Sequence, residues 1–534
     1  MSYDRTFDGI VIGGGHQALI CAAYMAKSGY DVLVLEESMH VGGGLKTRDV
    51  TGLGFQFNLC AKGHYNIPGT PWYNDLSLDE RGAIYVEPDT DAGFIDTDRP
   101  PILFSKDTDI AVETISAYSE ADAQQFRELR DISDRLIEEI YLPQRYDEPL
   151  APDERRHLLE SSELGQTFLE WSTTPVMVLL GEWFETPEVM MLVMYQMSLF
   201  GEPGEGFEAP SHTGGIARCF SGKYGYGIPR GGAEMLAIAL QQAVQQNGGT
   251  VLTHAPVRSI VVEDGQAVGV ELADGRRFGA ESFVASGVNP ELTFDRLVGL
   301  EQVDETFAQA VEEFEFEIWS TIHTHFALEE APAYSNDQGY DVHEVAFQLI
   351  GPESFDALGE GMEAVMTKTL PKSDSLGANV MTAIDPTQAP PGQHVATAMA
   401  AAPYDLHGDP TAWQDHAEEM AEHFLDTWST YAPNMTEDNV VASYSTTPQR
   451  IATWNPNMAQ GRTHLGELNE NQVLSNHFGY RTPIDGLYMC GSSSHPGAGI
   501  NGGAGYVAAK VIHDELGADP WWSPVDFAVH LQSL

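Results

Sequence analysis

Basic residues are scarce in this sequence. Lysine and arginine together number 27, against 79 aspartates and glutamates, so the formal net charge is −52. A surface of that sign repels the phosphates of nucleic acids and the head groups of anionic lipids. The composition therefore argues against a nucleic-acid partner. The same acid excess is compatible with a salt-rich source and does not define the reaction.

Cysteine is also scarce, with four residues in 534. No two of them have the short spacing of a zinc-binding or dithiol redox motif. His323 and His325 alternate along an expected strand, but no carboxylate accompanies them, so we expect no metal site. So few cysteines give no disulfide framework, which favours a reducing compartment. The cysteines are Cys21, Cys60, Cys219 and Cys490.

A long hydrophobic run is absent as well. The longest apolar run near the middle, residues 189–201, is bounded by Glu188 and Glu202 and is too short to cross a bilayer as a helix. The polar N-terminus reaches a glycine motif by residue 13, which leaves no room for a signal peptide. We therefore expect a soluble, cytoplasmic protein, and a peripheral membrane contact stays open.

The first 36 residues carry a strand–turn–helix–strand pattern. Residues 7–12 predict a buried strand, residues 16–28 a helix that ends at Gly29, and residues 31–35 a second buried strand. This order is typical of the βαβ unit that begins a parallel sheet with helices on its faces.

The turn of this unit matches the dinucleotide-binding fingerprint. Gly13 permits the tight turn, and Gly15 lets the backbone approach a pyrophosphate at the helix N-terminus. Ala18 is small enough for the helix to pack on the strand, and Glu36 is placed to accept hydrogen bonds from a ribose. A later match, residues 497–502, has no acid-tipped strand after it. One dinucleotide site, without a separate nicotinamide domain, is therefore expected.

The next segment distinguishes among dinucleotides. Residues 10–47, with Gly42 and Gly43 shortly after the acid, resemble the phytoene desaturase and flavin amine oxidase superfamily. The resemblance implies that FAD is the cofactor and that this glycine pair contacts its pyrophosphate. Many members carry an arginine after the pair. This chain has Gly44 there, and Lys46 is the candidate for that charge.

Three more segments extend the resemblance. Residues 228–232 resemble the family's PxGG turn, and Val257 falls where the family holds adenine through backbone groups. Residues 487–499, with Gly491, resemble the C-terminal flavin motif, whose helix would begin near Asn501 and Gly502. Together with residues 454–458, the wording of these motifs is closest to the phytoene dehydrogenase-related branch.

The chain is long enough for two or three domains. The expected fold is α/β, with a Rossmann-type, glutathione-reductase-like FAD-binding domain and an interleaved α+β substrate domain. The first is assigned to residues 1–105, 215–295 and 445–534, and the second to residues 106–214 and 296–444. The methionine-rich stretch 168–200 is either a core element or the wall of an apolar pocket.

Three side chains are candidates for catalysis. His64 follows the segment that in the family runs under the flavin, His495 lies in the flavin motif, and Tyr226 precedes the PxGG turn. The histidines are candidate bases for a proton next to a carbonyl. For each of the three, simple packing is the competing interpretation.

The resemblance implies an FAD-dependent dehydrogenase that desaturates a C–C bond of a largely apolar substrate, isoprenoid or cyclic and carbonyl-containing. Hydride would pass to flavin N5 and then, as electrons, to O2 or a quinone. Three alternatives stay open at this point: a flavin amine oxidase, a flavin-dependent isomerase, and a flavin-free prenyl-binding escort protein.

Overall fold

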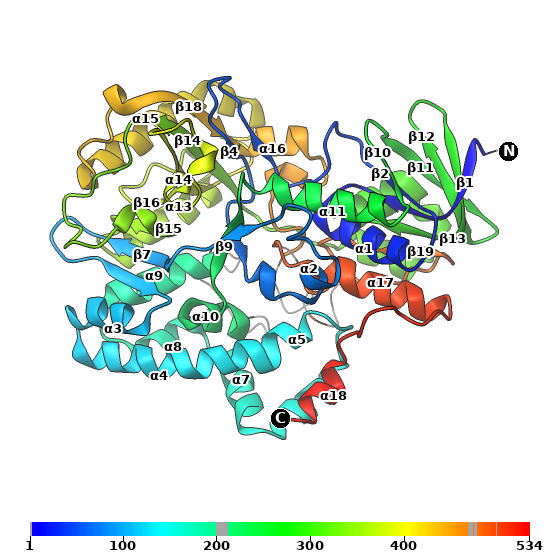
Figure 1. The fold of residues 1–534 in the computed structure, drawn as a ribbon, viewed down its shortest axis with the longest axis horizontal. Coiled ribbons are helices and arrows are strands. Elements are labelled where there is room, and N and C mark those ends of the chain that lie inside the picture. The colour runs from blue at the N-terminus through cyan, green and yellow to red at the C-terminus, as the bar shows by residue number, and fades with distance from the viewer. Residues whose placement is uncertain (1–2, 199–211, 468–471, 473, 475–477, 498) are drawn as a thin grey trace.

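The computed structural model describes the chain except for residues 1–2, 199–211, 468–471, 473, 475–477 and 498. In this part of the chain, two seven-stranded sheets lie side by side, with a layer of helices beneath the second (Figure 1). No helix among these residues has both the length and the apolar character that a membrane crossing requires.

The first sheet contains the predicted βαβ unit. Its centre is parallel, with β1 between β2 and β13, β10 beside β2, and β19 beside the second half of β13. An antiparallel meander of β11 and β12 extends from the first half of β13. The strands are β1 (Arg5–Ile12), β2 (Val32–Leu35), β10 (Thr250–Leu252), β11 (Val257–Glu263), β12 (Gln266–Leu272), β13 (Arg277–Ser286) and β19 (Leu487–Met489).

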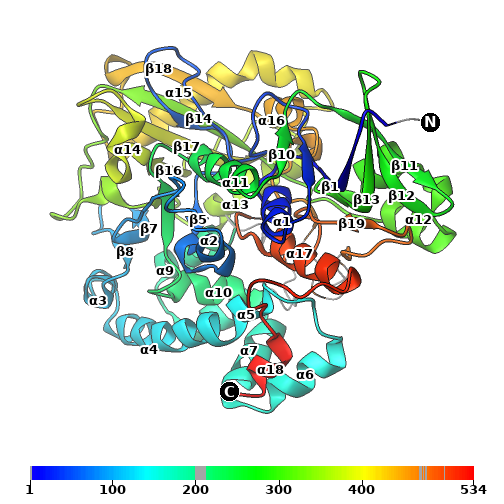
Figure 2. The same ribbon diagram turned by 45° about the vertical axis from the view of Figure 1, so that its right-hand side comes forward.

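Helix α1 (His16–Lys27) lies between α11 (Glu234–Gln246) and α17 (Gly503–Glu515) on this sheet (Figure 2). Every residue of α1 from His16 to Ala26 is buried. A helix that is apolar on all sides has to be covered on all sides, and the sheet and the two flanking helices provide that cover.

The second sheet has the strand order β18-β14-β17-β16-β15-β7-β8. Its pairs are antiparallel except for β15 and β7. The strands are β7 (Thr90–Ile95), β8 (Ile102–Ser105), β14 (Ser320–Leu328), β15 (Phe347–Ile350), β16 (Leu376–Val380), β17 (His394–Ala402) and β18 (Val440–Thr446).

One placement differs from the expectation, and one strand has a partner that the sequence does not indicate. Residues 90–105, expected in the nucleotide-binding domain, form β7 and β8 of the second sheet. Residues 250–252 form β10, which pairs in parallel with β2. β7 joins the second sheet through β15, and β10 joins the first through β2; both partners lie more than two hundred residues away, so local sequence carries no signal of these pairings.

The remaining elements cover these sheets and connect them. They are β3 (Thr47–Arg48), β4 (Phe57–Asn58), β5 (His64–Tyr65), β6 (Tyr85–Val86), β9 (Tyr226–Pro229), α2 (Pro71–Asp75), α3 (Thr108–Ser116), α4 (Glu120–Leu136), α5 (Leu142–Gln144), α6 (Pro152–Glu160), α7 (Glu163–Thr173), α8 (Val176–Trp183), α9 (Pro187–Ser198), α10 (His212–Phe220), α12 (Glu305–Glu312), α13 (Phe355–Thr367), α14 (Met381–Ile384), α15 (Trp413–Tyr431), α16 (Pro448–Trp454) and α18 (Phe527–Leu531).

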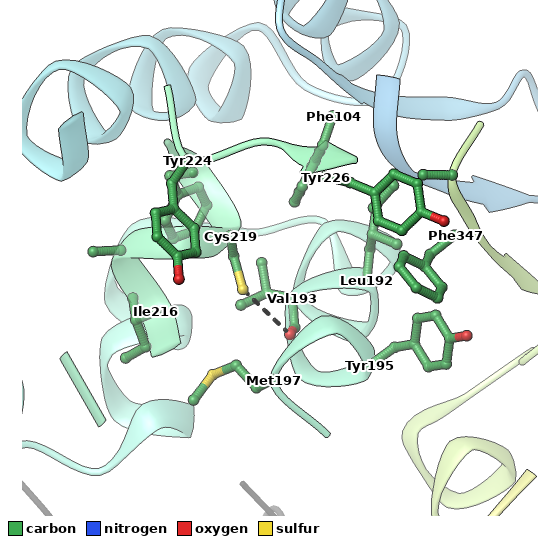
Figure 3. Packing of buried hydrophobic residues seen from close by; sticks show 14 of the residues in the cluster. Phe104, Leu192, Val193, Tyr195, Met197, Ile216, Cys219, Tyr224, Tyr226 and Phe347 are labelled. Carbon is green, nitrogen blue, oxygen red and sulfur yellow. Dashed lines mark hydrogen bonds between the residues drawn. The ribbon is translucent and has the colours of Figure 1, made fainter. Parts of the chain in front are cut away.

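The methionine-rich stretch forms α8 and α9 in the helical layer, and residues 199–200 lie outside the described residues. Met191 and Met197 are buried in the core that α9 shares with α10 (Figure 3). Met190 and Met194 pack against the same core, whereas Met177 is exposed. The methionines of α9 therefore fill a core between helices, whereas Met177 does not.

The N-terminal ends of α1 and α17 touch each other. The Gln17 side chain accepts a hydrogen bond from the Gly505 backbone N–H (2.9 Å) and donates one to Asn501 Oδ1 (3.2 Å). A Cβ atom at Gly505 would lie 2.1 Å from the Gln17 carbonyl oxygen. Only glycine allows this approach, through which the first helix of the chain contacts a helix near its C-terminal end.

We expect Gly505→Ala to lower the free energy of unfolding by about 1–3 kcal/mol, because the new methyl group meets backbone that cannot move aside. Gly181→Ala is the matched control. It is also a helical glycine, it is exposed, and nothing lies within 4 Å of its Cβ position. It should gain about 0.5–1 kcal/mol from helix propensity alone. Urea unfolding measures both, and equal effects would contradict the close contact.

Candidate active site

A cavity of about 740 Å³ opens at the carboxyl ends of β1 and β2 and continues to the second sheet. One wall comes from the glycine turns of the first sheet and the other from β14 and β17. Ligands of open parallel sheets bind at this edge, where helix N-termini point outward. The N-terminal residue of α1 and the segment before α17 both line the cavity.

Two glycine segments that are separate in sequence form one surface here. The Gly42 N–H donates to the Gly14 carbonyl (2.7 Å), and Gly15 forms a bridge with Gly42. Gly13 and Gly42 have φ of +91° and +118°, which side chains disfavour, and a Cβ at Gly43 would lie 3.4 Å from Gly15 Cα. The result is a bare backbone surface.

Gly15 is open toward the cavity. A Cβ atom at this position has no heavy atom within 4 Å, although the residue lines the cavity. Ala18 is buried, and its Cβ would lie 2.7 Å from any Cβ at Gly287, the residue that follows β13. Small residues therefore bring α1 close to the sheet while space is kept beside Gly15, as the fingerprint requires.

Glu36 lies at the end of β2, where it lines the cavity and is held by backbone. Its carboxylate accepts hydrogen bonds from Gly14 N–H (2.7 Å) and Ser38 N–H (2.8 Å). Each oxygen keeps a further lone pair for a ribose hydroxyl. Val257, the first residue of β11, lines the same end of the cavity.

Lys46 lines the cavity with its ammonium group 4.6 Å from the centre of the Trp454 ring. Burial lowers the pKa of this amine. The side chain of Lys46 is thus placed by an aromatic face and lies next to the bare glycine surface.

The C-terminal motif closes the cavity. Asn501 lines it and accepts a hydrogen bond from the Gly503 N–H at the start of α17 (2.8 Å), while Trp72 Nε1 donates to the Asn501 carbonyl (2.8 Å). Gly502 (φ +72°) and Gly491 do not line the cavity. Their Cβ positions would collide with the Trp72 ring and the Gly287 carbonyl, so these glycines serve close packing.

His64 lies outside the residues that line the cavity. It is fully buried, and its Nδ1 is 2.7 Å from the hydroxyl oxygen of Tyr85. Burial lowers the pKa of His64 to about 3, so the ring is neutral at physiological pH.

His495 and Tyr226 also lie outside this lining. His495 Nε2 is 2.9 Å from the Gln144 carbonyl oxygen, and its own carbonyl accepts a hydrogen bond from Tyr480. The Tyr226 hydroxyl donates to the Lys62 carbonyl (2.5 Å) and its ring packs in the core near Phe347 (Figure 3). Both side chains brace segments that form the cavity.

Several lining residues were not predicted from the sequence. Lys62 is 5% exposed, and its amine has no hydrogen-bond partner among the described residues. Thr321 and His323, alternate residues of β14, also line the cavity, as does Trp319 directly before the strand. For Thr321 and His323 the spacing of two was the available signal, because alternate residues of a strand share one face.

The charge of the lining is opposite to that of the whole protein. The carboxylates among the lining residues are Glu36 and Glu37, both directly after β2. The cations are Lys46, Lys62, Arg145, Arg218, Arg258 and Arg296. An anionic cofactor such as a dinucleotide fits such a lining, and the open space at Gly15 and the bare glycine surface fit its pyrophosphate.

Two family models match the chain. Residues 150–512 match the model described as flavin containing amine oxidoreductase, and residues 11–75 match an NAD(P)-binding Rossmann-like domain. The predicted fold class and superfamily are thereby confirmed. Among the described residues, no group of three His, Cys, Asp or Glu side chains is arranged to hold a metal ion.

Individual proteins give the same result. One of the subunits of limonene dehydrogenase from Castellaniella defragrans is 31% identical over 98% of both chains. A lycopene-forming phytoene desaturase from Pseudescherichia vulneris is 26% identical over 52% of this chain and 54% of its own. The structure of cyclohexylamine oxidase from Brevibacterium oxydans superposes with a TM-score of 0.60 at 14% identity, covering 96% of this chain and all of that one, which shows the fold alone.

We expect Gly15→Val to weaken FAD binding by about 10- to 100-fold, because the side chain enters space that the cofactor needs. The flavin content of the purified protein, read from its visible absorbance, measures this. The same substitution should leave the stability of the FAD-free protein unchanged, since no protein atom meets the new side chain. A yellow variant would refute the placement of Gly15.

Lys62 should make stability depend on pH. Burial lowers the pKa of Lys62 to about 7 from 10.5. Between these values only the unfolded chain carries the proton, so the free energy of unfolding should rise with pH by about 1.4 kcal/mol per unit. Lys62→Met should remove this slope.

The measurement is urea unfolding between pH 7 and 10 with FAD at a fixed excess. Lys223→Met is the control, since this lysine is exposed on the surface and pairs with Glu138. Its curve should run parallel to that of the wild type in this window. If the free energy of unfolding depends on pH in the same way in the wild type and in Lys62→Met, the pKa of Lys62 is not lowered by burial.

Proposed function

The chain belongs to the flavin-containing amine oxidoreductase family and is an FAD-dependent oxidoreductase, and on this premise we propose that it desaturates a C–C bond of a largely apolar, uncharged small molecule. Isoprenoid and cyclic carbonyl compounds are the substrate classes. The single observation that carries this proposal is the distribution of charge in the cavity.

The carboxylates among the described lining residues are Glu36 and Glu37, both directly after β2. Around the Tyr65–Tyr224 pair the lining contains Arg145, which donates to the Tyr224 hydroxyl, and Arg218. An ammonium substrate would meet cations there without a counter-ion, and burying an unpaired charge is costly. An uncharged hydrocarbon skeleton meets no such cost.

One feature of this region is typical of amine recognition. Tyr65 and Tyr224 stack in parallel, with centroids 6.2 Å apart, and aromatic faces attract cations. However, Arg145 donates a hydrogen bond to the Tyr224 hydroxyl (2.9 Å), and Arg218 lines the same part of the cavity. These fixed cations already occupy the neighbourhood of the rings and would repel an ammonium group.

The proposal assigns the cofactor to the residues predicted from the sequence. The glycine surface faces the pyrophosphate, Glu36 the ribose, Val257 the adenine, and the N-terminus of α17 the flavin. The full set is Gly13, Gly15, Ala18, Glu36, Gly42, Gly43, Lys46, Val257, Gly491, Asn501 and Gly502. Within it, Ala18, Gly491 and Gly502 serve by bringing elements close together.

FAD, when bound, supplies the hydride acceptor for this chemistry, with O2 or a quinone as the final oxidant. The protein's own task is to exclude water and to hold a C–H bond in position. Phe347, Met399 and Ala401 present apolar surface to the cavity for this purpose. For His64, His495 and Tyr226 we assign a positioning role, because none of the three lines the cavity and each is hydrogen-bonded to a neighbouring protein group.

The names of the relatives support this proposal. Limonene and phytoene are apolar isoprenoids, and both names denote removal of hydrogen. The identity with the limonene dehydrogenase chain extends over almost the full length of both proteins, so it covers the cavity walls as well as the nucleotide site.

Anaerobic flavin bleaching tests the proposal. We expect isoprenoids or cyclic ketones to bleach the oxidised flavin and simple amines to leave it unchanged, because the cavity offers an ammonium no counter-ion. Bleaching by amines alone would place the protein among amine oxidases. Product formation without net bleaching would make it an isomerase. NADPH alone should not bleach the flavin, since the sequence has one dinucleotide fingerprint.

A further inference from the structure

The carboxyl group of Glu317 is buried next to the wall of the cavity. Glu317 precedes β14, and its side chain is 4% exposed. Its Oε1 accepts a hydrogen bond from the backbone N–H of His464 (2.7 Å). The same oxygen lies 3.9 Å from Nδ1 of the His464 ring. A buried carboxyl group therefore faces one nitrogen of this imidazole.

The other nitrogen of the ring is open to the cavity. His464 is one of the lining residues, and its side chain is 13% exposed. Its Nε2 has no hydrogen-bond partner among the described residues. It differs from Nε2 of His64 and Nδ1 of His323, which are also unpaired but have almost no accessible surface. A ligand in the cavity can therefore reach Nε2 of His464.

The position of His464 is fixed by its neighbours. The Ser320 hydroxyl donates to the Gly461 carbonyl (2.5 Å), which ties the chain before His464 to the start of β14. The Trp319 ring, which also lines the cavity, packs against the imidazole with ring centroids 5.6 Å apart. With the hydrogen bond to Glu317, these contacts hold both the backbone and the ring of His464 in place.

The other candidate bases lack this combination. His64 and His495 do not line the cavity. His323 lines it, but its Nδ1 has almost no accessible surface, and the same is true of the Lys62 amine. His464 has a place in the lining, a reachable nitrogen and a buried carboxyl group behind the ring. These are the features of a positioned general base.

Burial determines where the proton of this pair lies. Burial raises the pKa of Glu317 to about 8, while the Arg462 cation lowers it and Glu467 raises it further. Burial lowers the pKa of His464 to about 4, and the Arg218 cation acts in the same direction. At pH 7 the imidazole is therefore neutral and Glu317 carries a proton. With its ring proton on Nδ1, His464 presents the Nε2 lone pair to the cavity.

We propose that His464 is the base of the desaturation and takes the proton from the carbon next to a carbonyl group of the substrate. Glu317 acts through the imidazole and is a positioning residue. This inference rests on the proposed function and deepens it, because it selects cyclic carbonyl compounds among the proposed substrate classes. A carbonyl group is what makes the neighbouring C–H bond acidic enough for a histidine.

The atoms and electrons of the step balance. The α-carbon loses its proton to Nε2 of His464, and the β-carbon loses a hydride to the oxidised flavin. The electron pair of the broken α-C–H bond becomes the second bond between these carbons, so the product is a conjugated enone. The substrate gives up two electrons in all, and O2 or a quinone receives them afterwards. His464 then releases its proton to water.

Exchange of the α-proton tests the base without redox turnover. The photoreduced holoprotein, which cannot oxidise a ketone, is mixed in D2O with dihydrocarvone, a saturated cyclic isoprenoid ketone. We expect deuterium to enter the α-position faster than without protein, as read by proton NMR. His464→Gln should slow the protein-dependent exchange about 100-fold, the usual contribution of a positioned base. An unchanged rate in this variant, or no protein-dependent exchange in the wild type, would overturn the proposal.

His416→Gln is the matched control. His416 also stands beside a glutamate, with its Nδ1 2.6 Å from Glu419 Oε2, but this pair is exposed on α15 and does not line the cavity. The exchange rate and the flavin content of this variant should equal those of the wild type. If His416→Gln slows exchange as much as His464→Gln, the cavity histidine is not the base.

Glu317→Gln tests the pair through its pH profile. It keeps an acceptor for the His464 N–H and removes the ionisable group. In the wild type, Glu317 loses its proton as the pH rises through about 8, and the new negative charge beside Nδ1 makes the imidazole a stronger base. Between pH 7 and 9 the protein-dependent exchange should rise about three- to tenfold in the wild type and stay flat in Glu317→Gln. Equal rises would overturn the assignment, and this result stays decisive if His464→Gln does not fold.

Failure of the proposed function gives a different result. If dihydrocarvone exchanges its α-proton through His464 but no ketone or isoprenoid bleaches the oxidised flavin, the base stands and the desaturation does not. If these compounds bleach the flavin at the same rate in the wild type and in His464→Gln, the desaturation stands and the base does not.

Discussion

The contact between the N-terminal ends of α1 and α17 is the constraint on which the cavity depends. Gly505 lets the two helices approach until its N–H reaches the Gln17 side chain, and Gln17 in turn holds Asn501. Residues near both ends of the chain are thereby fixed beside one another. Because unsatisfied N–H groups gather at both helix ends, a closer approach also concentrates positive potential where an anion binds.

The elements that the sequence predicts well are those whose signal is local. The strand–turn–helix unit around Gly15 follows from apolar periodicity and turn residues within one window. The partners of β7 and β10 could not be predicted, since each pairs with a strand more than two hundred residues away. Sheet edges are settled by tertiary packing, which the local pattern does not encode.

The same distinction separates the two halves of the site. The cofactor residues lie in motifs because a pyrophosphate demands bare backbone, and bare backbone demands glycine at fixed spacing. The substrate wall has no such requirement. Lys62 and His323 come from segments that only the fold brings together. His495 lies in a motif and is predicted as a catalytic base, yet its ring bonds to a backbone carbonyl. Residue type and motif membership are weak guides where contacts are long-range.

The cavity also reverses the balance of charge that the composition suggests. A chain with 79 acidic residues keeps two of them in the lining, both at the ribose end. The acidic surface thus favours solubility, and the cationic cavity favours binding of an anionic cofactor. Past the cofactor, the fixed cations make an uncharged substrate the favourable one, and Phe347, Met399 and Ala401 then provide the apolar surface against which such a substrate packs.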